Sequence, residues 1–462
     1  MDLAFASGLE QADLLRGREV SSVELVEFYL DRIARIDPEL NAFVTVCADD
    51  ALARARELDG TSGDEPFRGV PIGIKDLTAT KGIRTTYSSR AFADNVPDFD
   101  AAVARRLREA GFVIVGKTNT PEFGTTAFTE SELNGVTRNP WNTESTPGGS
   151  SGGAAAAIAA GLIPLAQGTD GGGSIRIPAS CCGLFGLKPS RGRVSAAPFS
   201  SLEGLSTSGP IARTVADAAG LLDVLEGYEP GDPSWAPPPG RPFRDEVATD
   251  PGRLRIAVTI EPPVDTPVDT ACAEAVAAAA ALLAEIGHEL LEETPPWRES
   301  ELFDAFLTVW QVGPTLYPLP DASLLTPLNR RLAETAYATS AAAYAQAVVR
   351  LQTIARRVVS FWSEVDVVLT PTLALPPVPI GWQEEVPDPI DQLWRSVEFT
   401  PFTAIANLTG LPAVSLPLGE SPDGLPIGVQ AIGPPADEAT LLRLSAQLEE
   451  ARPWRERRPA VS

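Results

Sequence analysis

Histidine and lysine are scarce in this sequence. The 462 residues include one histidine, His288, and four lysines, which are Lys75, Lys81, Lys117 and Lys188. A single histidine argues against zinc sites of the usual histidine-containing kinds, and it leaves only one candidate base for a Ser-His-Asp triad. That histidine lies in LLAEIGHELLEE, where a glycine closes an alanine-rich helical pattern. We therefore expect His288 to be a helix-end residue without a part in catalysis.

Cysteines and long apolar runs are also few. The cysteines are Cys47, Cys181, Cys182 and Cys272, and they form no CxxC or metal-binding spacing. We therefore expect reduced, buried thiols. No segment offers 18 uncharged apolar residues, and the first residues lack the basic start and apolar run of a signal peptide. The expected location is cytoplasmic, without a membrane partner.

Positive charge is outweighed by negative charge, because the formal net charge is −24 and the acidic residues are spread along the chain. Such a surface repels nucleic-acid phosphates and anionic lipid head groups. The expected partner is therefore a small-molecule substrate and not a nucleic acid. The assembly state stays open between monomer and homodimer.

The apolar residues, which make up 44% of the chain, are enough for a sizeable core. Segments 254–259, 271–286 and 289–291 repeat a strand-helix-strand rhythm that is typical of α/β folds. Further strands are predicted at 365–369 and 427–432. The sequence thus predicts an α/β protein.

One motif matches a phosphate-binding loop in letters only. Residues Gly111 to Thr118, GFVIVGKT, fit the pattern GxxxxGK[ST]. In a true phosphate loop the strand comes before the first glycine, and the intervening residues form the cradle. Here the intervening FVIV is itself the predicted strand, so we expect no nucleotide site.

The glycine-rich stretch from 147 to 190 carries the strongest functional signal. It holds two serines among glycines, Ser150 and Ser174, and between them the apolar text predicts a helix at 154–160 and a strand at 162–166. Ser174 directly follows three glycines, whose unhindered amides can converge on one point. A nucleophile and its oxyanion hole require this combination of hydroxyl and amides.

A nucleophilic serine needs a base, and lysine can serve if burial depresses its pKa. Lys75 ends the apolar strand predicted at 70–74, although Asp76 would oppose a depressed pKa if it points inward. Lys117 also ends a predicted strand, and Lys188 lies close to the glycine-rich stretch. Composition alone does not separate these three lysines.

Four ordered blocks together resemble the amidase signature family. They are GVPIGIKDL, PGGSSGG, GTDGGGSIRIPAS and GLKPSRGRVS, and the resemblance extends from about Leu9 to LPLGESPDGLPIGVQ near the C-terminus. It implies a single α/β domain over residues 1–462, with one large mixed sheet flanked by helices on both sides. It also implies a triad in which Ser174 is the nucleophile, Ser150 on a cis peptide relays the proton, and Lys75 is the ultimate base.

The resemblance implies further site residues. Oxyanion donors would be the amides of Gly171, Gly172, Gly173 and Ser174, and backbone substrate contacts would lie near Gly124 and Thr125. Asp170 and Arg176 would form an ion pair that supports the loop. The sequence departs from the family pattern at Gly171, where a residue with a side chain is usual.

The expected activity is hydrolysis of the C–N bond of amides, without metal or cofactor. Neutral aryl or alkyl amides are the expected substrates, with carbamates and esters as further possibilities, because aromatic residues occur in segments predicted to border the site, mainly in a variable helical and proline-rich region at about 300–400. These residues are Phe128, Trp310, Tyr317, Trp382, Trp394, Phe399 and Phe402. The alternatives are the glutaminase component of a tRNA-dependent amidotransferase, and an inactive binding protein on the same scaffold.

Overall fold

The computed structural model describes residues 2–199 and 201–462. In this part of the chain, eleven strands form one mixed sheet in the order β1-β3-β2-β6-β8-β7-β12-β13-β11-β9-β10. The strands are β1 Phe43–Val46, β2 Pro71–Lys75, β3 Val113–Thr118, β6 Leu165–Asp170, β7 Phe185–Lys188, β8 Thr207–Ala212, β9 Arg255–Val258, β10 Glu289–Leu291, β11 Val367–Pro371, β12 Ala413–Glu420 and β13 Pro426–Ile432. A separate two-stranded ribbon pairs β4 Glu130–Ser131 with β5 Gly135–Val136.

The sheet combines parallel and antiparallel pairs. Strand β2 runs parallel to both β3 and β6, and β9 runs parallel to β10 and β11. Between these two parallel groups the pairs are antiparallel, from β6 through β8, β7, β12 and β13 to β11. The side chains of β2, β3 and β13 are buried throughout, as expected for strands covered on both faces.

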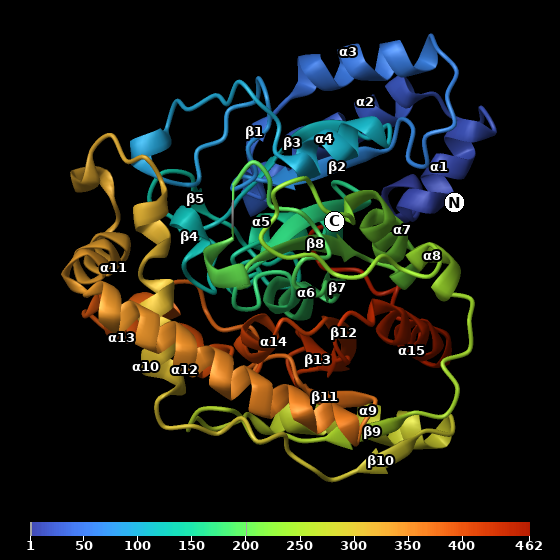
Figure 1. Ribbon diagram of the computed structural model, residues 1–462. Helices are drawn as coiled ribbons and strands as arrows, with labels where there is room; N and C mark the ends of the chain where they lie inside the picture. The colour runs from blue at the N-terminus through green and yellow to red at the C-terminus, as the bar shows by residue number, and fades with distance from the viewer. Residues whose placement is uncertain (1, 200) are drawn as a thin grey trace.

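Helices cover both faces of this sheet (Figure 1). One core cluster joins the sheet to α4, α7, α9 and α15, and two others join it to α2, α3, α5 and α6 and to α10, α12 and α14. The helices are α1 Gly8–Arg16, α2 Ser22–Leu40, α3 Ala48–Asp59, α4 Ala102–Glu109, α5 Gly152–Ala159, α6 Arg176–Cys182, α7 Val215–Leu225, α8 Phe243–Glu246, α9 Thr270–Glu285, α10 Leu302–Trp310, α11 Pro327–Ala338, α12 Ala341–Val359, α13 Pro389–Phe399, α14 Ala404–Thr409 and α15 Glu438–Ala451. The predicted α/β fold with helices on both sides is confirmed.

The strand-helix-strand segment predicted at 254–291 is present as β9, α9 and β10. The segment 111–118, which matches a phosphate-binding loop in letters, does not form such a loop. Its FVIV residues lead into and form part of strand β3, and Lys117 is fully buried. The prediction for 162–166 was wrong, since strand β6 begins at Leu165 and continues to Asp170. The chain turns between the end of α5 and Pro164, with Gly161 at φ 68° and the amide of Leu162 bonded to the carbonyl of Ala157.

The helices between about 300 and 400 gather at one side of the molecule, whereas strand β11 of the same segment lies within the sheet (Figure 1). Figure 1 shows α10, α11, α12 and α13, in yellow to orange, grouped together. Residues of α10 and α13 line a pocket with Gly172 and Ser174 of the glycine-rich segment. Helix α13 begins within the proline-rich text, with Pro389 in its first turn and the side chain of Asp388 as its N-cap. Proline is tolerated there because the first-turn amides have no partner inside the helix.

Among the residues that the structure describes, no helix combines the length and the apolar composition that crossing a bilayer requires.

Candidate active site

Lys75 is the last residue of β2, and its side chain is completely buried. Its Nζ lies 2.8 Å from Ser150 Oγ and 2.9 Å from Thr169 Oγ1. Thr169 belongs to β6, which pairs with β2, so the parallel register of two neighbouring strands brings this hydroxyl to the lysine. Sequence reasoning did not identify Thr169.

Ser150 lies in the turn before α5, and the peptide bond that precedes it, Gly149–Ser150, is cis. Gly124 lies against this serine, because a Cβ on Gly124 would stand 3.0 Å from Ser150 Oγ. A side chain at position 124 would therefore crowd the hydroxyl that Lys75 contacts. This close approach gives a physical reason for glycine at one of the two predicted substrate contacts.

Ser174 lies between the end of β6 and the start of α6. Its carbonyl accepts a hydrogen bond of 3.2 Å from the amide of Ser151, which connects the two serine-bearing segments. Ser174 also lines a pocket, together with Gly124, Thr125 and Gly172. The fold thus brings residues 124–125, 150–151 and 172–174 together at one place.

The four predicted oxyanion amides are not equivalent. The amide of Gly173 donates to Asp170 Oδ1 at 2.8 Å, so it is already engaged. The amides of Gly171, Gly172 and Ser174 have no acceptor among the residues that the structure describes. Without a ligand, the hydrogen of the Gly173 amide is therefore engaged by the carboxylate, whereas the other three predicted donors are open within the described part of the chain.

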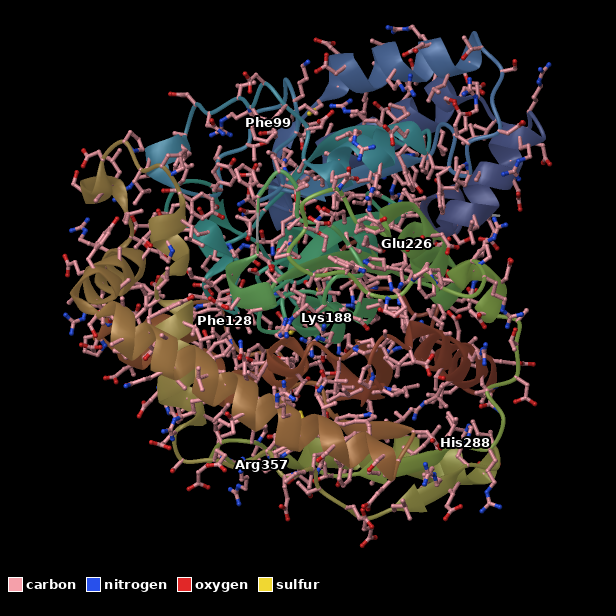
Figure 2. The ribbon with its side chains drawn as sticks, in the orientation of Figure 1. Phe99, Phe128, Lys188, Glu226, His288 and Arg357 are labelled. Atoms are coloured by element: carbon pink, nitrogen blue, oxygen red, sulfur yellow. The ribbon has the colours of Figure 1, made fainter. Side chains whose placement is uncertain are left out.

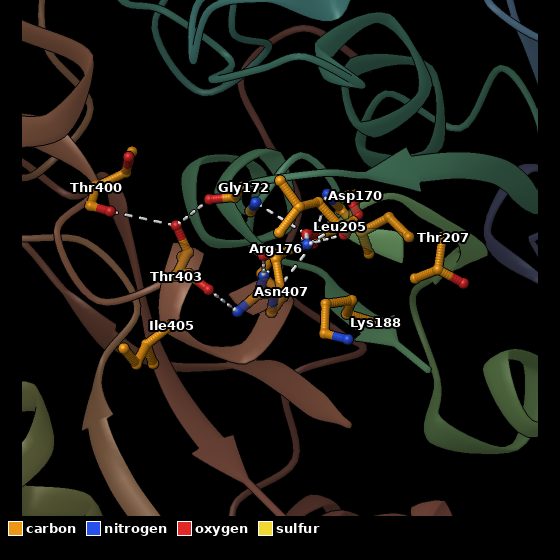
Figure 3. Close-up of polar contacts among 12 residues, drawn as sticks. Asp170, Gly172, Arg176, Lys188, Leu205, Thr207, Thr400, Thr403, Ile405 and Asn407 are labelled. Carbon is orange, nitrogen blue, oxygen red and sulfur yellow. Dashed lines mark hydrogen bonds and ion pairs between the residues drawn. The ribbon is translucent and has the colours of Figure 1, made fainter. Parts of the chain in front are cut away.

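The glycine loop rests on a buried ion pair, as predicted (Figure 3). Arg176 Nη2 lies 2.8 Å from Asp170 Oδ1, and both side chains are fully buried. Arg176 also donates to Asn407 Oδ1 at 2.7 Å and to the carbonyl of Thr403 at 2.8 Å. Burial by itself would raise the pKa of Asp170, but the charge and hydrogen bonds of Arg176 lower it to about 2.

Helix α14 supplies neutral partners to the same loop. Asn407 Nδ2 donates to the carbonyl and to Oδ1 of Asp170, at 2.9 and 2.8 Å, and Thr403 Oγ1 donates to the carbonyl of Gly172 at 2.5 Å. Figure 3 shows these contacts converging on the loop from one side. The loop that carries Ser174 is therefore fixed by residues more than 200 positions away in sequence, which sequence reasoning could not identify.

Burial lowers the pKa of Lys75 to about 7, and the negative charge of Asp170 opposes this shift. Asp76 was expected to oppose the shift only if it pointed inward; it is buried, but its charge is not the one that acts on Lys75. The carboxylate of Asp76 instead accepts hydrogen bonds from the amide and hydroxyl of Thr86, and its charge acts on Lys117. A lysine with a pKa near 7 is neutral in a large fraction of molecules at neutral pH.

Lys117 and Lys188, the other candidate bases, have different surroundings. Lys117 Nζ donates to the carbonyl of Thr78 and to the hydroxyls of Thr80 and Thr85, the latter two at 3.0 and 3.1 Å. Burial lowers the pKa of Lys117 to about 8.

Lys188 Nζ donates to the carbonyl of Pro189 at 2.7 Å, and burial together with the charge of Arg176 lowers its pKa to about 7. Neither Lys117 nor Lys188 has a hydrogen bond to Ser150 or Ser174 in the described residues. Of the three buried lysines, Lys75 alone contacts one of the two serines.

His288 lies at the opposite end of the sheet from β2, next to β10 (Figure 2). Its Nδ1 accepts a hydrogen bond of 3.1 Å from the amide of Leu254, so the proton of the neutral ring is on Nε2, which lies 2.8 Å from Gln447 Oε1. The expectation of a helix-end residue outside the site is confirmed.

The pocket in front of Ser174 is apolar. Among the described residues no charged side chain lines it, and the ring-bearing side chains come mainly from one helix, α10. Its lining comprises Gly124, Thr125, Thr126, Ala127, Gly172, Ser174, Ile177, Pro263, Val264, Leu302, Phe303, Phe306, Trp310, Leu393, Ser396, Val397, Thr400, Pro401, Ala404, Ile405 and Leu408.

Of the seven aromatic residues predicted to border the site, only Trp310 lines this pocket. The lining does not include Phe128, Tyr317, Trp382, Trp394, Phe399 or Phe402, although Leu393, Thr400 and Pro401, from the segments that carry the last three, do line the pocket. Most of these rings pack elsewhere: Phe128 stacks on Phe399 in the core at 5.3 Å, and Tyr317 stacks on Phe123 at 4.3 Å. Trp394 stands behind the lining, edge-on to Phe303 at 4.6 Å.

Two pocket aromatics were missed by sequence reasoning. Phe303 and Phe306 precede Trp310 at spacings of seven and four residues, so all three lie on one face of α10. The text ELFDAFLTVW carries this helical spacing, and it is the signal that could have found them.

Comparisons with known proteins agree with this fold. Residues 24–442 match the family described as Amidase. The chain therefore belongs to the amidase signature family, whose members act on amide bonds.

Several individual relatives are named as amide-hydrolysing enzymes. A putative amidase of Synechocystis is 40% identical over 97% of this chain and 89% of its own length. The structure of a 6-aminohexanoate cyclic dimer hydrolase superimposes with a TM-score of 0.94 at 36% identity, covering 100% of this chain and 99% of the other. A bacterial aryl acylamidase of the same family superimposes with a TM-score of 0.87 at 28% identity, covering 98% of each chain.

A component of the glutamyl-tRNA(Gln) amidotransferase from Synechococcus is also similar, with 38% identity over 96% of this chain and 97% of its own length. Identity at this level does not separate a free-standing hydrolase from an amidotransferase component. The residues of the pocket bear on this choice.

Proposed function

We propose that this amidase hydrolyses neutral, largely apolar amides through an acyl-enzyme on Ser174. The observation that carries the proposal is the contact of 2.8 Å between buried Lys75 Nζ and Ser150 Oγ, beside an uncharged pocket that Ser174 lines. Ser174 is the nucleophile, Ser150 the proton relay and Lys75 the base.

Neutral Lys75 accepts the proton of Ser150, and Ser150 accepts the proton of Ser174 while Ser174 Oγ bonds to the amide carbonyl carbon. The oxyanion that forms is stabilised by the amides of Gly171, Gly172 and Ser174. Collapse of this intermediate breaks the C–N bond, and the proton on Lys75 returns through Ser150 to the leaving nitrogen. Water then attacks the acyl ester by the same route, which releases the acid and restores Ser174.

The pocket lining supports a neutral substrate. Burying a charge without a partner is costly, and the described lining offers no charged side chain to compensate one. Phe303, Phe306 and Trp310 instead offer flat apolar surfaces that suit an aryl or alkyl group. Carbamates and esters present the same carbonyl oxygen to the loop. A cyclic diamide, such as the 6-aminohexanoate cyclic dimer in the name of one relative, also suits this pocket, because it has no free terminus and carries no charge.

The same observation disfavours the alternative of a glutaminase component. Free glutamine carries an ammonium and a carboxylate at its α-carbon, and each would need a charged or strongly polar partner in the pocket. The lining offers hydroxyls of Thr125, Ser396 and Thr400 but no ionised group. A glutaminase of this kind would also need the other chains of its amidotransferase.

A substrate panel tests this proposal with the isolated chain. The panel contains an anilide, an aliphatic amide, an aryl carbamate, an aryl ester, a cyclic diamide and glutamine. We expect kcat/KM for the best neutral amide or carbamate to exceed that for glutamine by at least about 100-fold, the scale on which an apolar pocket rejects an added polar group. Faster turnover of glutamine than of every neutral amide and carbamate would overturn the proposal.

A further inference from the structure

The resemblance implies a residue with a side chain at the position of Gly171, and in the structure an indole lies where that side chain would begin. A Cβ on Gly171 would stand 3.1 Å from Cη2 and 3.2 Å from Cζ3 of Trp310. Both distances are shorter than the optimal carbon–carbon contact of about 3.5–4.0 Å. The far end of the indole therefore rests directly on the backbone of the loop that precedes Ser174. At the next position a Cβ on Gly172 would meet only Phe306 Cζ, at 3.9 Å.

The indole of Trp310 is held at three sides. Its Nε1 donates to the carbonyl of Thr125 at 3.3 Å, and its ring stacks on Phe306 with centroids 5.5 Å apart and planes inclined by 19°. Its third contact is Gly171. Trp310 thus contacts both the glycine loop and the segment Gly124–Thr125, and it lines the same pocket as Gly124, Thr125 and Gly172.

We propose that Trp310 is a specificity-determining residue, which limits the size of the substrate group lying next to the glycine loop, and that Gly171 is the positioning residue that admits its indole. The proposal deepens the proposed function and depends on it only through Ser174 as the nucleophile. Because Nε1 donates to the carbonyl of Thr125, Trp310 also takes up one of the two lone pairs of an oxygen that a substrate N–H would use. Both effects favour a compact apolar substrate group next to Trp310.

The size limit set by Trp310 can be tested through covalent labelling of Ser174, without knowing the natural substrate. In an alkyl fluorophosphonate, Ser174 Oγ bonds to phosphorus as fluoride leaves, and the serine proton passes to Ser150 and Lys75. The ratio of labelling rates for a bulky aryl-alkyl probe and a small ethyl probe reports the room beside the loop. We expect Trp310→Ala to raise this ratio about tenfold, the scale of discrimination by apolar pocket size. Trp310→Phe, which also loses Cη2 and Cζ3, should raise it about threefold and serves if the alanine variant does not fold.

Gly171→Ala tests the positioning role. The added methyl group must push the indole into the pocket, so the bulky-to-small ratio should fall about threefold. In the double variant with Trp310→Phe this fall should disappear, because residues in contact give non-additive effects. Gly172→Ala is the matched comparison, since its methyl group meets no atom of Trp310, and its effect on the ratio should be the same with Trp310 or Phe at position 310.

Three results would overturn the proposal. The first is an unchanged labelling ratio in folded Trp310→Ala or Trp310→Phe, and the second is an effect of Gly171→Ala that is equally large with Trp or Phe at position 310. The third is an effect of Gly172→Ala that depends on the residue at position 310 as strongly as that of Gly171→Ala. Failure of the proposed function has a different signature. In that case Ser174→Ala would still be labelled. If Ser174→Ala instead loses labelling while the ratios in the other variants are unaltered, only the size limit set by Trp310 is refuted.

Discussion

Three of the four lysines in this chain are fully buried, and burial lowers the pKa of each. A lowered pKa therefore does not identify the base. The partners of each ammonium group differ: Lys117 is surrounded by a carbonyl and threonine hydroxyls, Lys188 by a carbonyl, and Lys75 by the hydroxyls of Ser150 and Thr169. At the scale of single residues, the chemistry follows from contact geometry.

The first residue-scale prediction concerns the pH dependence of acylation. Lys75 acts as a base only when neutral, and its pKa is lowered to about 7. The acylation rate should therefore be low below pH 6, rise along a single ionisation near pH 7, and level off above pH 8. Replacing Lys75 by methionine should remove this ionisation and reduce kcat/KM by about 10²- to 10⁴-fold, the usual contribution of a general base.

His288→Ala is the control for this experiment, because its ring contacts only Leu254 and Gln447 among the described polar groups and lies at the other end of the sheet. The profile should survive this change. An unchanged profile in folded Lys75→Met, or its loss in folded His288→Ala, would show that the base is another residue.

The second residue-scale prediction separates the two serines. Ser174→Ala should lose both turnover and fluorophosphonate labelling, because the covalent route itself disappears. Ser150→Ala should retain slow labelling, with the rate reduced about 10²- to 10⁴-fold, because only the proton relay is removed. Mass spectrometry of the labelled peptides measures both effects. Normal labelling of Ser174→Ala would assign the nucleophile to another residue.

At the scale of elements, the glycine loop depends on helix α14 and on the ion pair between Asp170 and Arg176. These contacts set the directions of the loop amides: Asp170 takes the amide of Gly173 and leaves the neighbouring amides open. The loop is thereby prevented from relaxing when no substrate is bound. The conformational freedom that a third glycine adds is offset by this support.

Neutralising Asp170 tests this support. Asp170→Asn leaves Arg176 buried with its charge uncompensated, so the free energy of unfolding should fall by about 3–5 kcal/mol. Denaturant unfolding monitored by fluorescence measures the change. Asp13→Asn, which breaks the exposed pair with Arg16, should have no measurable effect. Equal stabilities of the two variants would mean that the buried pair does not hold the loop.

At the scale of the whole molecule, the proposed chemistry needs no metal ion. Within residues 2–199 and 201–462, no group of three or more histidine, cysteine, aspartate or glutamate side chains is arranged to hold one. We therefore expect kcat/KM to be unchanged after prolonged treatment with EDTA, while a zinc hydrolase treated in parallel loses activity. Loss of activity that zinc restores would contradict the serine mechanism.

The sequence by itself determined the α/β class, the place of the two serine-bearing turns, and the short set of candidate bases. These features are local: glycines mark turns, apolar periodicity marks strands and helices, and rare residue types leave few candidates. The helical spacing of Phe303, Phe306 and Trp310 was also present in the sequence. The sequence did not indicate on which side of the molecule that helix lies.

Only the tertiary structure decided which lysine reaches a serine, which loop amides remain free, and which aromatic residues form the pocket. Each of these depends on contacts between residues that are far apart in sequence, such as Lys75 with Ser150 or Gly171 with Trp310. Strand register and helix packing set these contacts, and neither is encoded in local propensity. The role of Gly171 makes the point: an isolated glycine indicates freedom of the backbone, whereas the folded chain uses it to seat an indole.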